Sequence, residues 1–148
     1  MITPTASEQS SLSAALAAEH AAIYAYGVVA AYANPTRSDQ VDADVAAHRA
    51  LRDALVDSLT SAGLEAAPAA AGYATPFPVV DPPSAAQLAA QTEFDVSVAW
   101  RSVVENGETA ETRTFAVDAL AATAVRAALW RSVLGVDPWT LAFPGLPA

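Results

Sequence analysis

Apolar residues recur every three or four positions along four stretches of this chain. In the first stretch Leu12, Leu16, Ile23 and Tyr26 share one helical face, at the spacing of a helix that packs against other helices. The later stretches carry similar stripes. The pattern predicts an all-α fold with helices over about 11–33, 39–62, 85–105 and 109–134.

Helix-end signals flank these stretches. Capping boxes, in which two side chains satisfy free backbone amides, mark two helix starts: Thr5 with Glu8, and Ser84 with Gln87. For the first helix a cap at Ser10 or Ser11 is the alternative. The turn that follows Asn34-Pro35 is short, so the first two predicted helices must lie antiparallel.

The segment 63–84 is different in kind, because five prolines exclude a continuing helix. A linker between two domains would leave each half as a bare helical hairpin, which cannot bury enough apolar surface alone. We therefore expect one domain over 1–148, with 63–84 as a long crossover between the second and third helices. The expected anchors of the crossover are Tyr73, Phe77, Val79 and Val80.

Short loops within two helix pairs, joined by one long connection, are typical of an antiparallel four-helix bundle with ferritin-like connectivity. The remaining segment, 135–148, is a tail that contains Trp139, Leu141 and Phe143. We expect these three side chains to fold back over one end of the bundle.

Ionisable residues interrupt the apolar stripes at positions that face inward. Glu19 takes the place seven residues after Leu12, His48 and Arg52 fall within the stripe of the second helix, and Glu93 falls within that of the third. On the fourth helix the stripe Phe115, Ala122, Val125 and Leu129 includes Asp118, whereas a stripe through Ala119 and Arg126 fits nearly as well. Because an unpaired buried charge costs several kcal/mol, these residues are expected to form a buried polar cluster or to bind a ligand.

Other polar and aromatic residues lie beside this predicted cluster. His20 lies next to Glu19 on the neighbouring helical face, one turn before Tyr24, and is expected at the boundary of the core. Asp44 precedes His48 by one turn and either orients its imidazole or faces water. Trp100, Trp130 and Tyr32 are expected in the core or at an interface.

Three motifs, "AEHAAIYAYG", "HRALRDAL" and "WTLAFPGLP", resemble the ferritin-like family called domain of unknown function 4439. Metal-loaded ferritin-like proteins use a Glu from each of two helices and a Glu-x-x-His from each of the other two. The resemblance therefore implies Glu19, Glu93 and Asp118 as carboxylates and His48 as the histidine of such a site.

The chain departs from this pattern, because Val45 and Ala121 stand where the two motifs have Glu and His. Arg52 also brings a fixed positive charge towards the place of a cation. No metal is therefore favoured, although a mononuclear divalent site made of Glu19, His48 and Glu93 remains chemically reasonable.

The interpretations of the polar cluster correspond to different functions. If the cluster is an ion-pair network, the protein is a non-enzymatic binding or structural module, and this is the preferred interpretation. If it holds iron, manganese or zinc, the protein is an oxidoreductase with a degenerate site. A small polar ligand held within the bundle is the third possibility.

The composition argues against two kinds of binding partner. The net charge of −9, with no lysine, argues against nucleic acid and anionic membranes, and the apolar run from Ala21 to Ala33 is too short to span a bilayer. The start of the chain has no hydrophobic signal core, and there is no cysteine, so a cytoplasmic protein is expected.

Alanine-rich surface predicts a homodimer, because shallow side chains let another helix approach closely. The expected interface residues are Ala14, Ala15, Ala18, Ala22 and Ala25, with Tyr24 and Tyr32 as anchors.

Overall fold

The computed structural model describes residues 3–147 and consists of four long helices and the segments that join them. They are α1 (Ala6–Tyr32), α2 (Ser38–Ser61), α3 (Pro82–Asn106) and α4 (Ala110–Val133), with a 3-10 turn, η1 (Pro35–Arg37), before α2. No strand occurs within these residues, so the predicted all-α class is confirmed.

Two helices begin earlier than expected. α1 begins at Ala6 because the hydroxyl of Thr5 accepts a hydrogen bond from the amide of Glu8, which selects the first of the two candidate starts. α3 begins at Pro82, where Asp81 is the N-cap and Ser84 is the third helical residue of the capping box. The prediction of Ser84 as the cap is therefore wrong. Proline is tolerated in the first turn because the N–H that it lacks has no helical partner there.

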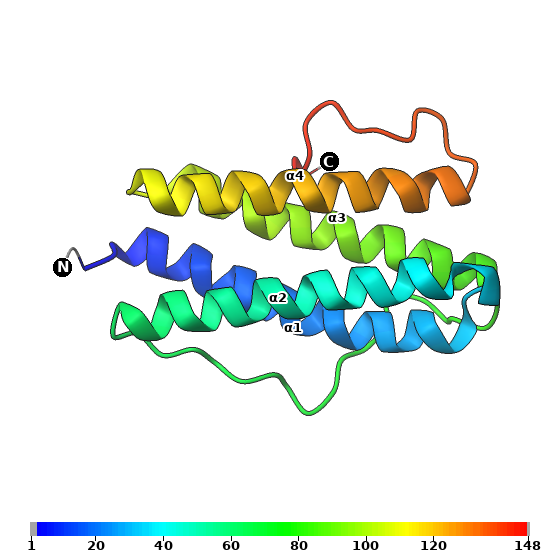
Figure 1. Ribbon diagram of the computed structural model, residues 1–148, viewed down its shortest axis with the longest axis horizontal. Coiled ribbons are helices and arrows are strands. Elements are labelled where there is room, and N and C mark those ends of the chain that lie inside the picture. Colours follow the sequence, from blue (N-terminus) through cyan, green and yellow to red (C-terminus); the bar gives the residue numbers. More distant parts are fainter. Residues whose placement is uncertain (1–2, 148) are drawn as a thin grey trace.

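The helices lie side by side along one long axis (Figure 1). α1 and α2 run in opposite directions, and the segment between α2 and α3 returns along the bundle, so that α3 begins near the end where α2 begins. α3 packs on both α1 and α4, and α1 packs on α2. Between α2 and α4 the surface is hollowed by a groove of about 290 Å³, into which Leu51, Phe115 and Arg126 extend.

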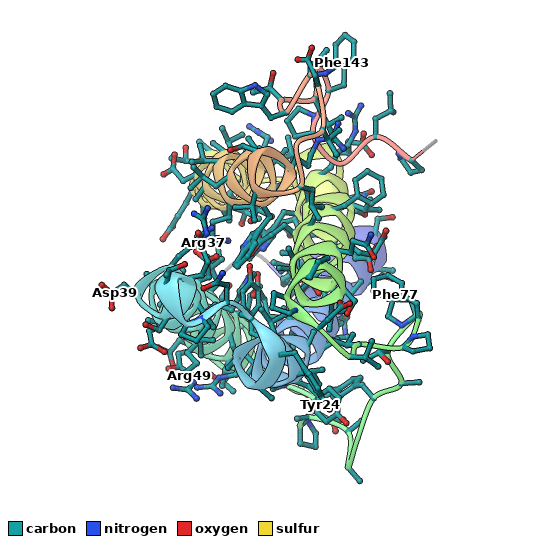
Figure 2. The ribbon with its side chains drawn as sticks, turned by 90° about the vertical axis from the view of Figure 1, so that its right-hand side faces the viewer. Tyr24, Arg37, Asp39, Arg49, Phe77 and Phe143 are labelled. Carbon is teal, nitrogen blue, oxygen red and sulfur yellow. The ribbon has the colours of Figure 1, made fainter. Side chains whose placement is uncertain are left out.

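The segment between α2 and α3 is held against α1 by a few contacts. The ring of Tyr73 packs at a tilt against that of Tyr24, with centroids 5.4 Å apart, and the Nε2 atom of His20 lies 3.0 Å from the carbonyl oxygen of Ala67. Phe77 and Val79 of this segment are half-buried and pack against the core (Figure 2 labels Phe77). Val80 is 70% exposed and anchors nothing, contrary to the prediction.

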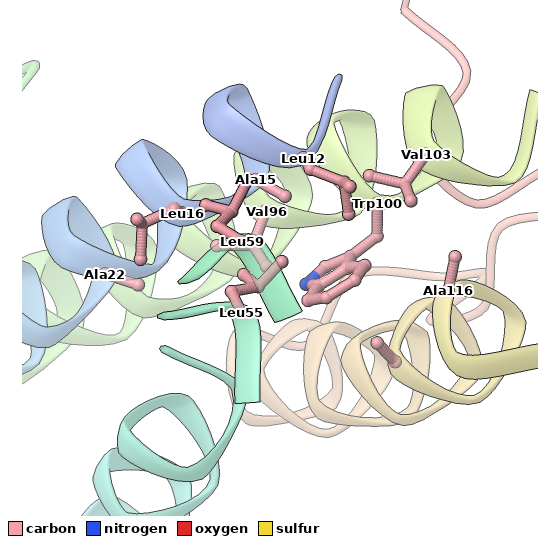
Figure 3. Close-up of a cluster of buried hydrophobic side chains, with 11 residues drawn as sticks. Leu12, Ala15, Leu16, Ala22, Leu55, Leu59, Val96, Trp100, Val103 and Ala116 are labelled. Carbon is pink, nitrogen blue, oxygen red and sulfur yellow. The ribbon is translucent and has the colours of Figure 1, made fainter. Parts of the chain in front are cut away.

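Two apolar clusters fill the interior, one towards each end of the bundle. The first contains side chains from all four helices, among them Leu16, Leu55 and Trp100 (Figure 3). The second contains Val41 of α2 and Leu88 of α3 and reaches Trp130 of α4. Burying such side chains is the main force that holds the helices together.

The tail after α4 turns back along the outer side of α4 (Figure 1) and does not cover the end of the bundle, so that expectation is wrong. The Nε and Nη2 atoms of Arg131 donate to the carbonyl oxygens of Trp139 and Pro138, at 2.9 and 2.8 Å, and thereby direct the chain along the helix. Phe143 is 69% exposed and projects from the tail (Figure 2).

α1 is the one helix within residues 3–147 that is long and apolar enough to cross a membrane by length and composition. In the structure its buried face belongs to the protein core, where Ala15 and Ala22 are inaccessible. These two alanines cannot belong to an interface between copies, contrary to the prediction, whereas Tyr24 and Tyr32 are each 44% exposed. The homodimer itself stays a prediction.

Replacing Gly145 by alanine is expected to release the tail from the bundle. Gly145 has φ +72°, and a Cβ atom there would collide with the carbonyl group of Ser97 and meet the Cβ of Arg101 at 3.0 Å. Limited proteolysis read by mass spectrometry should show faster cleavage within 134–147, with an unchanged helical circular dichroism spectrum. Gly63→Ala is the matched control, because Gly63 has a similar φ of +73° and nothing lies within 4 Å of its added Cβ. Equal cleavage of both variants would contradict this account of the tail.

Candidate functional site

Polar side chains from all four helices meet in the middle of the bundle, between the two apolar clusters. We call this set the core network. Its members are Glu19, Tyr26, Asp44, His48, Glu93, Trp100, Thr123, Arg126 and Trp130, all of which are buried. Each helix presents its members three, four or seven residues apart, which places them on one inward face.

His48 is the centre of the core network. Its Nδ1 atom lies 2.7 Å from Oε2 of Glu19, and its Nε2 atom lies 2.9 Å from Oε1 of Glu93. The other oxygen of Glu19 accepts the indole N–H of Trp100 at 2.7 Å. The imidazole therefore bridges α1 and α3 from α2, with a carboxylate at each nitrogen.

Arg126 is the second cation of the core network. Its Nε atom lies 3.2 and 3.1 Å from the two oxygens of Glu93, and its Nη2 atom donates to the hydroxyl of Thr123 at 3.1 Å. That hydroxyl donates in turn to the carbonyl oxygen of Ala119. Two carboxylates, Glu19 and Glu93, thus face two cationic groups, so their charges balance.

Tyr26, Asp44 and Trp130 extend the core network towards the second apolar cluster. The hydroxyl of Tyr26 contacts both Oε1 of Glu93 and Oδ2 of Asp44, while the indole N–H of Trp130 lies 2.8 Å from that Oδ2 and 3.0 Å from the Tyr26 oxygen. The Tyr26 ring also lies 5.2 Å from the His48 ring, between centroids. Each buried aromatic polar atom thus has a partner, as aromatic residues in a core require.

The environment changes the proton affinity of three members. Burial alone would lower the pKa of His48, but hydrogen bonds to Glu19 and Glu93 and the charges of both outweigh burial and raise it to about 9. Burial also raises the pKa of Asp44, against the hydrogen bond from Trp130. Burial and the charges of Glu93 and Asp44 raise the pKa of Tyr26 well above its ordinary value. His48 is therefore an imidazolium at neutral pH and donates from both nitrogens.

The structure brings together three of the predicted cluster residues and separates two. Glu19, His48 and Glu93 are in direct contact. Arg52 is 30% exposed and pairs with Asp53, because its long side chain extends from the stripe of α2 towards water. Asp118 is exposed beside the α2–α4 groove.

The position of Asp118 follows from the rotation of α4. This helix buries the face that carries Ala119 and Arg126, and leaves Val125 61% and Leu129 47% exposed. The second of the two stripes considered for α4 is therefore the inward one. Arg126 supplies the guanidinium that was expected from Arg52.

The residues that were expected beside the cluster have other contacts in the structure than the predicted ones. Asp44 is buried and bonds to Tyr26 and Trp130, not to His48. His20 bonds to the backbone of the segment between α2 and α3, and Tyr24 is 44% exposed. Neither His20 nor Tyr24 touches the core network.

Sequence reasoning missed the polar roles of Tyr26, Trp100 and Trp130, which it treated as apolar core residues. A signal was present in two cases, because Tyr26 follows Glu19 by seven residues and Trp100 follows Glu93 by seven. That spacing places an aromatic N–H or O–H on the same face as a buried carboxylate. Thr123 carried no comparable signal.

The core network as arranged does not fit a divalent cation. A metal requires its ligand atoms around one point at about 2.0–2.2 Å, whereas the two carboxylates lie at opposite nitrogens of the His48 ring. Arg126 also holds a positive charge against Glu93. Within residues 3–147, no three side chains of His, Asp or Glu gather in a metal-binding arrangement.

Comparison with known proteins places this chain in a family. Residues 11–148 match the family described as domain of unknown function (DUF4439). The chain belongs to the DUF4439 family. Among curated proteins, this DUF4439 chain has no significant match.

A solved structure is similar to the DUF4439 chain over nearly its whole length. It is the crystal structure of a conserved hypothetical protein, rv2844, from Mycobacterium tuberculosis, which is 44% identical in sequence with a TM-score of 0.86. The similarity covers 93% of this chain and 97% of that one. The two proteins therefore have the same fold and related sequences.

The raised pKa of His48 predicts that stability falls at alkaline pH. The folded protein retains a proton that the unfolded chain, with the ordinary pKa of 6.5, releases. The charged His48 therefore adds to the free energy of unfolding in full below about pH 6.5, and this addition is lost as the pH rises through about 9. It is about 3 kcal/mol, at about 1.4 kcal/mol for each pKa unit. Urea unfolding between about pH 6 and pH 10 measures it, and His48→Gln should remove most of the slope. An equal slope in both proteins would contradict a charged His48.

Arg126→Met is expected to destabilise the fold strongly, by about 3–5 kcal/mol, because Glu93 keeps a buried charge with one cation fewer. The double variant Arg126→Met, Glu93→Gln should recover much of the loss. Arg52→Met is the matched control, since an exposed pair contributes about 0–1 kcal/mol. Chemical denaturation at neutral pH measures all three. A larger loss for Arg52→Met than for Arg126→Met would contradict the assignment.

Proposed function

We propose that this DUF4439 protein is a non-enzymatic helical module for binding, in which the core network holds the scaffold together. One observation carries the proposal: every side chain of the core network forms a hydrogen bond with another member. Within residues 3–147, the one buried side-chain nitrogen or oxygen without a partner is Nε2 of Gln40, which lies outside the core network. A catalytic centre instead needs a group that is free to meet a substrate.

The geometry also supplies a reason for a polar core. Buried ion pairs often add little net stability compared with apolar side chains of the same volume. A bundle rich in alanine has few large side chains that could fix the position of each helix along the bundle axis. Glu19, His48, Glu93 and Arg126 meet only in one register, so a slip by one turn in any helix would leave a buried charge unpaired.

We further propose that the bundle is ferritin-like and that the protein is cytoplasmic. The long return segment between α2 and α3 (Figure 1) supports the first proposal, as do the motifs described above. The absence of cysteine from the whole sequence agrees with the second. We keep the homodimer as a proposal that light scattering tests.

The alternative is a metal-dependent oxidoreductase. It is favoured by the meeting of Glu19, His48 and Glu93, from three helices, at the middle of the bundle. It would require His48 to lose its proton and both carboxylates to leave their present donors. Arg126 would then lie beside the cation, and we therefore prefer the non-enzymatic proposal.

Metal analysis decides between these proposals. We expect protein purified without chelator, then incubated with Fe²⁺, Mn²⁺ or Zn²⁺ and desalted, to retain well under one ion per chain. Its melting temperature should be unchanged by the added ion, since a ligand that binds the folded state would raise it. Glu19→Ala is the control that removes one possible ligand. Stoichiometric metal that disappears in Glu19→Ala would overturn the proposal in favour of the oxidoreductase.

A further inference from the structure

The tail and the outer side of α4 form an apolar cavity that is open to solvent on one side. Its volume is about 310 Å³, which lies at the lower end of the range for small-molecule sites. The floor is made by the exposed face of α4, and the tail forms the other wall. The principal lining residues are Val125, Ala128, Leu129, Trp139, Leu141 and Pro144.

Contacts on both sides of this cavity hold the tail against the helices, and they keep the cavity open. At one side Arg131 holds the carbonyl groups of Pro138 and Trp139. At the other, Gly145 packs against the backbone of Ser97 so closely that no Cβ atom would fit. Between these contacts the tail passes over Val125 and Leu129 without filling the space above them.

Arg131 gives the cavity a positive charge. Its guanidinium donates to two neutral carbonyl groups, and no carboxylate within residues 3–147 forms an ion pair with it. It also borders a second hollow of about 460 Å³, which Phe77, Phe94 and Leu134 help to line. Arg131 is thus an unneutralised cation beside an apolar space, in a chain whose net charge is −9.

We propose that the tail cavity binds a small apolar carboxylate, with its hydrocarbon part against α4 and its carboxylate at Arg131. The volume accommodates about ten heavy atoms at about 30 Å³ each, which is the size of a medium-chain fatty acid or an aromatic acid. Apolar lining supplies affinity, and the single cation supplies orientation and selects the anionic end. The inference gives the proposed binding module a ligand class, but it does not depend on the core network.

The test uses octanoate, with octanol as its neutral analogue, in a nitrogen-15 NMR titration of the whole protein. The indole N–H signals are built-in reporters, because Trp139 lines the cavity whereas Trp100 and Trp130 donate within the core network. Octanoate should shift the Trp139 signal saturably, with a dissociation constant of about a millimolar, and leave the other two in place. Octanol should bind at least fivefold more weakly.

Variants separate the cavity from its charge. Ala128→Phe fills the cavity and should weaken octanoate at least tenfold. Ala121→Phe is its control, because Ala121 is exposed on α4 away from the cavity lining. Arg131→Met removes both the charge and the tie to the tail, so it should weaken both ligands, but octanoate at least fivefold more than octanol. Arg131→Lys keeps the charge and should retain more of the preference for octanoate over octanol than Arg131→Met.

Several results would overturn the proposal. They are octanoate shifts that do not saturate, that persist in Ala128→Phe, or that match octanol in size and affinity. A Trp139 signal that instead moves with protein concentration, together with a dimer mass by light scattering, would show that a second copy covers the tail cavity. Because these readouts involve no metal, failure here leaves the metal analysis of the core network as a separate test.

Discussion

The imidazolium of His48, held between two buried carboxylates, is the interaction on which the rest of the structure depends. Glu19 and Glu93 lie on helices that pack against each other, and the cation from α2 lies between their charges at 2.7 and 2.9 Å. Arg126 of α4 completes the balance at Glu93. All four helices are thus connected through one compact set of charges, whose mutual attraction is strong because water is excluded. The apolar clusters on either side provide that exclusion, so packing and electrostatics support each other.

The sequence was sufficient to place Glu19, His48 and Glu93 inside, because large apolar residues one or two turns away mark the inward faces of α1, α2 and α3. The same spacing also placed Arg52 inside, where the reach of its side chain to water overrules it. The sequence was not sufficient for α4, where alanine on every face makes two stripes almost equal. Hydrophobic periodicity alone favoured the face with Val125 and Leu129, both of which are exposed. Pairing the guanidinium of Arg126 with Glu93 decides the rotation, and that partner lies 33 residues away in the sequence. A contact of this kind is set by the tertiary structure and leaves no local signal.

The same limit explains the helix start at Pro82 and the course of the tail. Asp81 is a better N-cap than Ser84 because its carboxylate accepts the Ser84 amide while the Ser84 hydroxyl accepts the Asp81 amide, a choice that short-range chemistry could have supplied. The tail could not be placed in this way. Its path depends on the reach of Arg131 and on the absence of a side chain at Gly145, two contacts that the apolar residues of the tail do not indicate.

Two arginines of α4, one buried and one at the surface, therefore differ in whether a carboxylate neutralises their charge. Arg126 is held in a core whose polar side chains bond to one another, and its charge is paired with that of Glu93. Arg131, little more than a turn later on the same helix, donates only to neutral carbonyl groups and borders the apolar tail cavity. A charge that is already balanced gains little from a ligand, whereas a cation without a counterion gains from any anion that its surroundings admit. Recognition is therefore expected at the outer side of α4, on a scaffold that the core network keeps rigid.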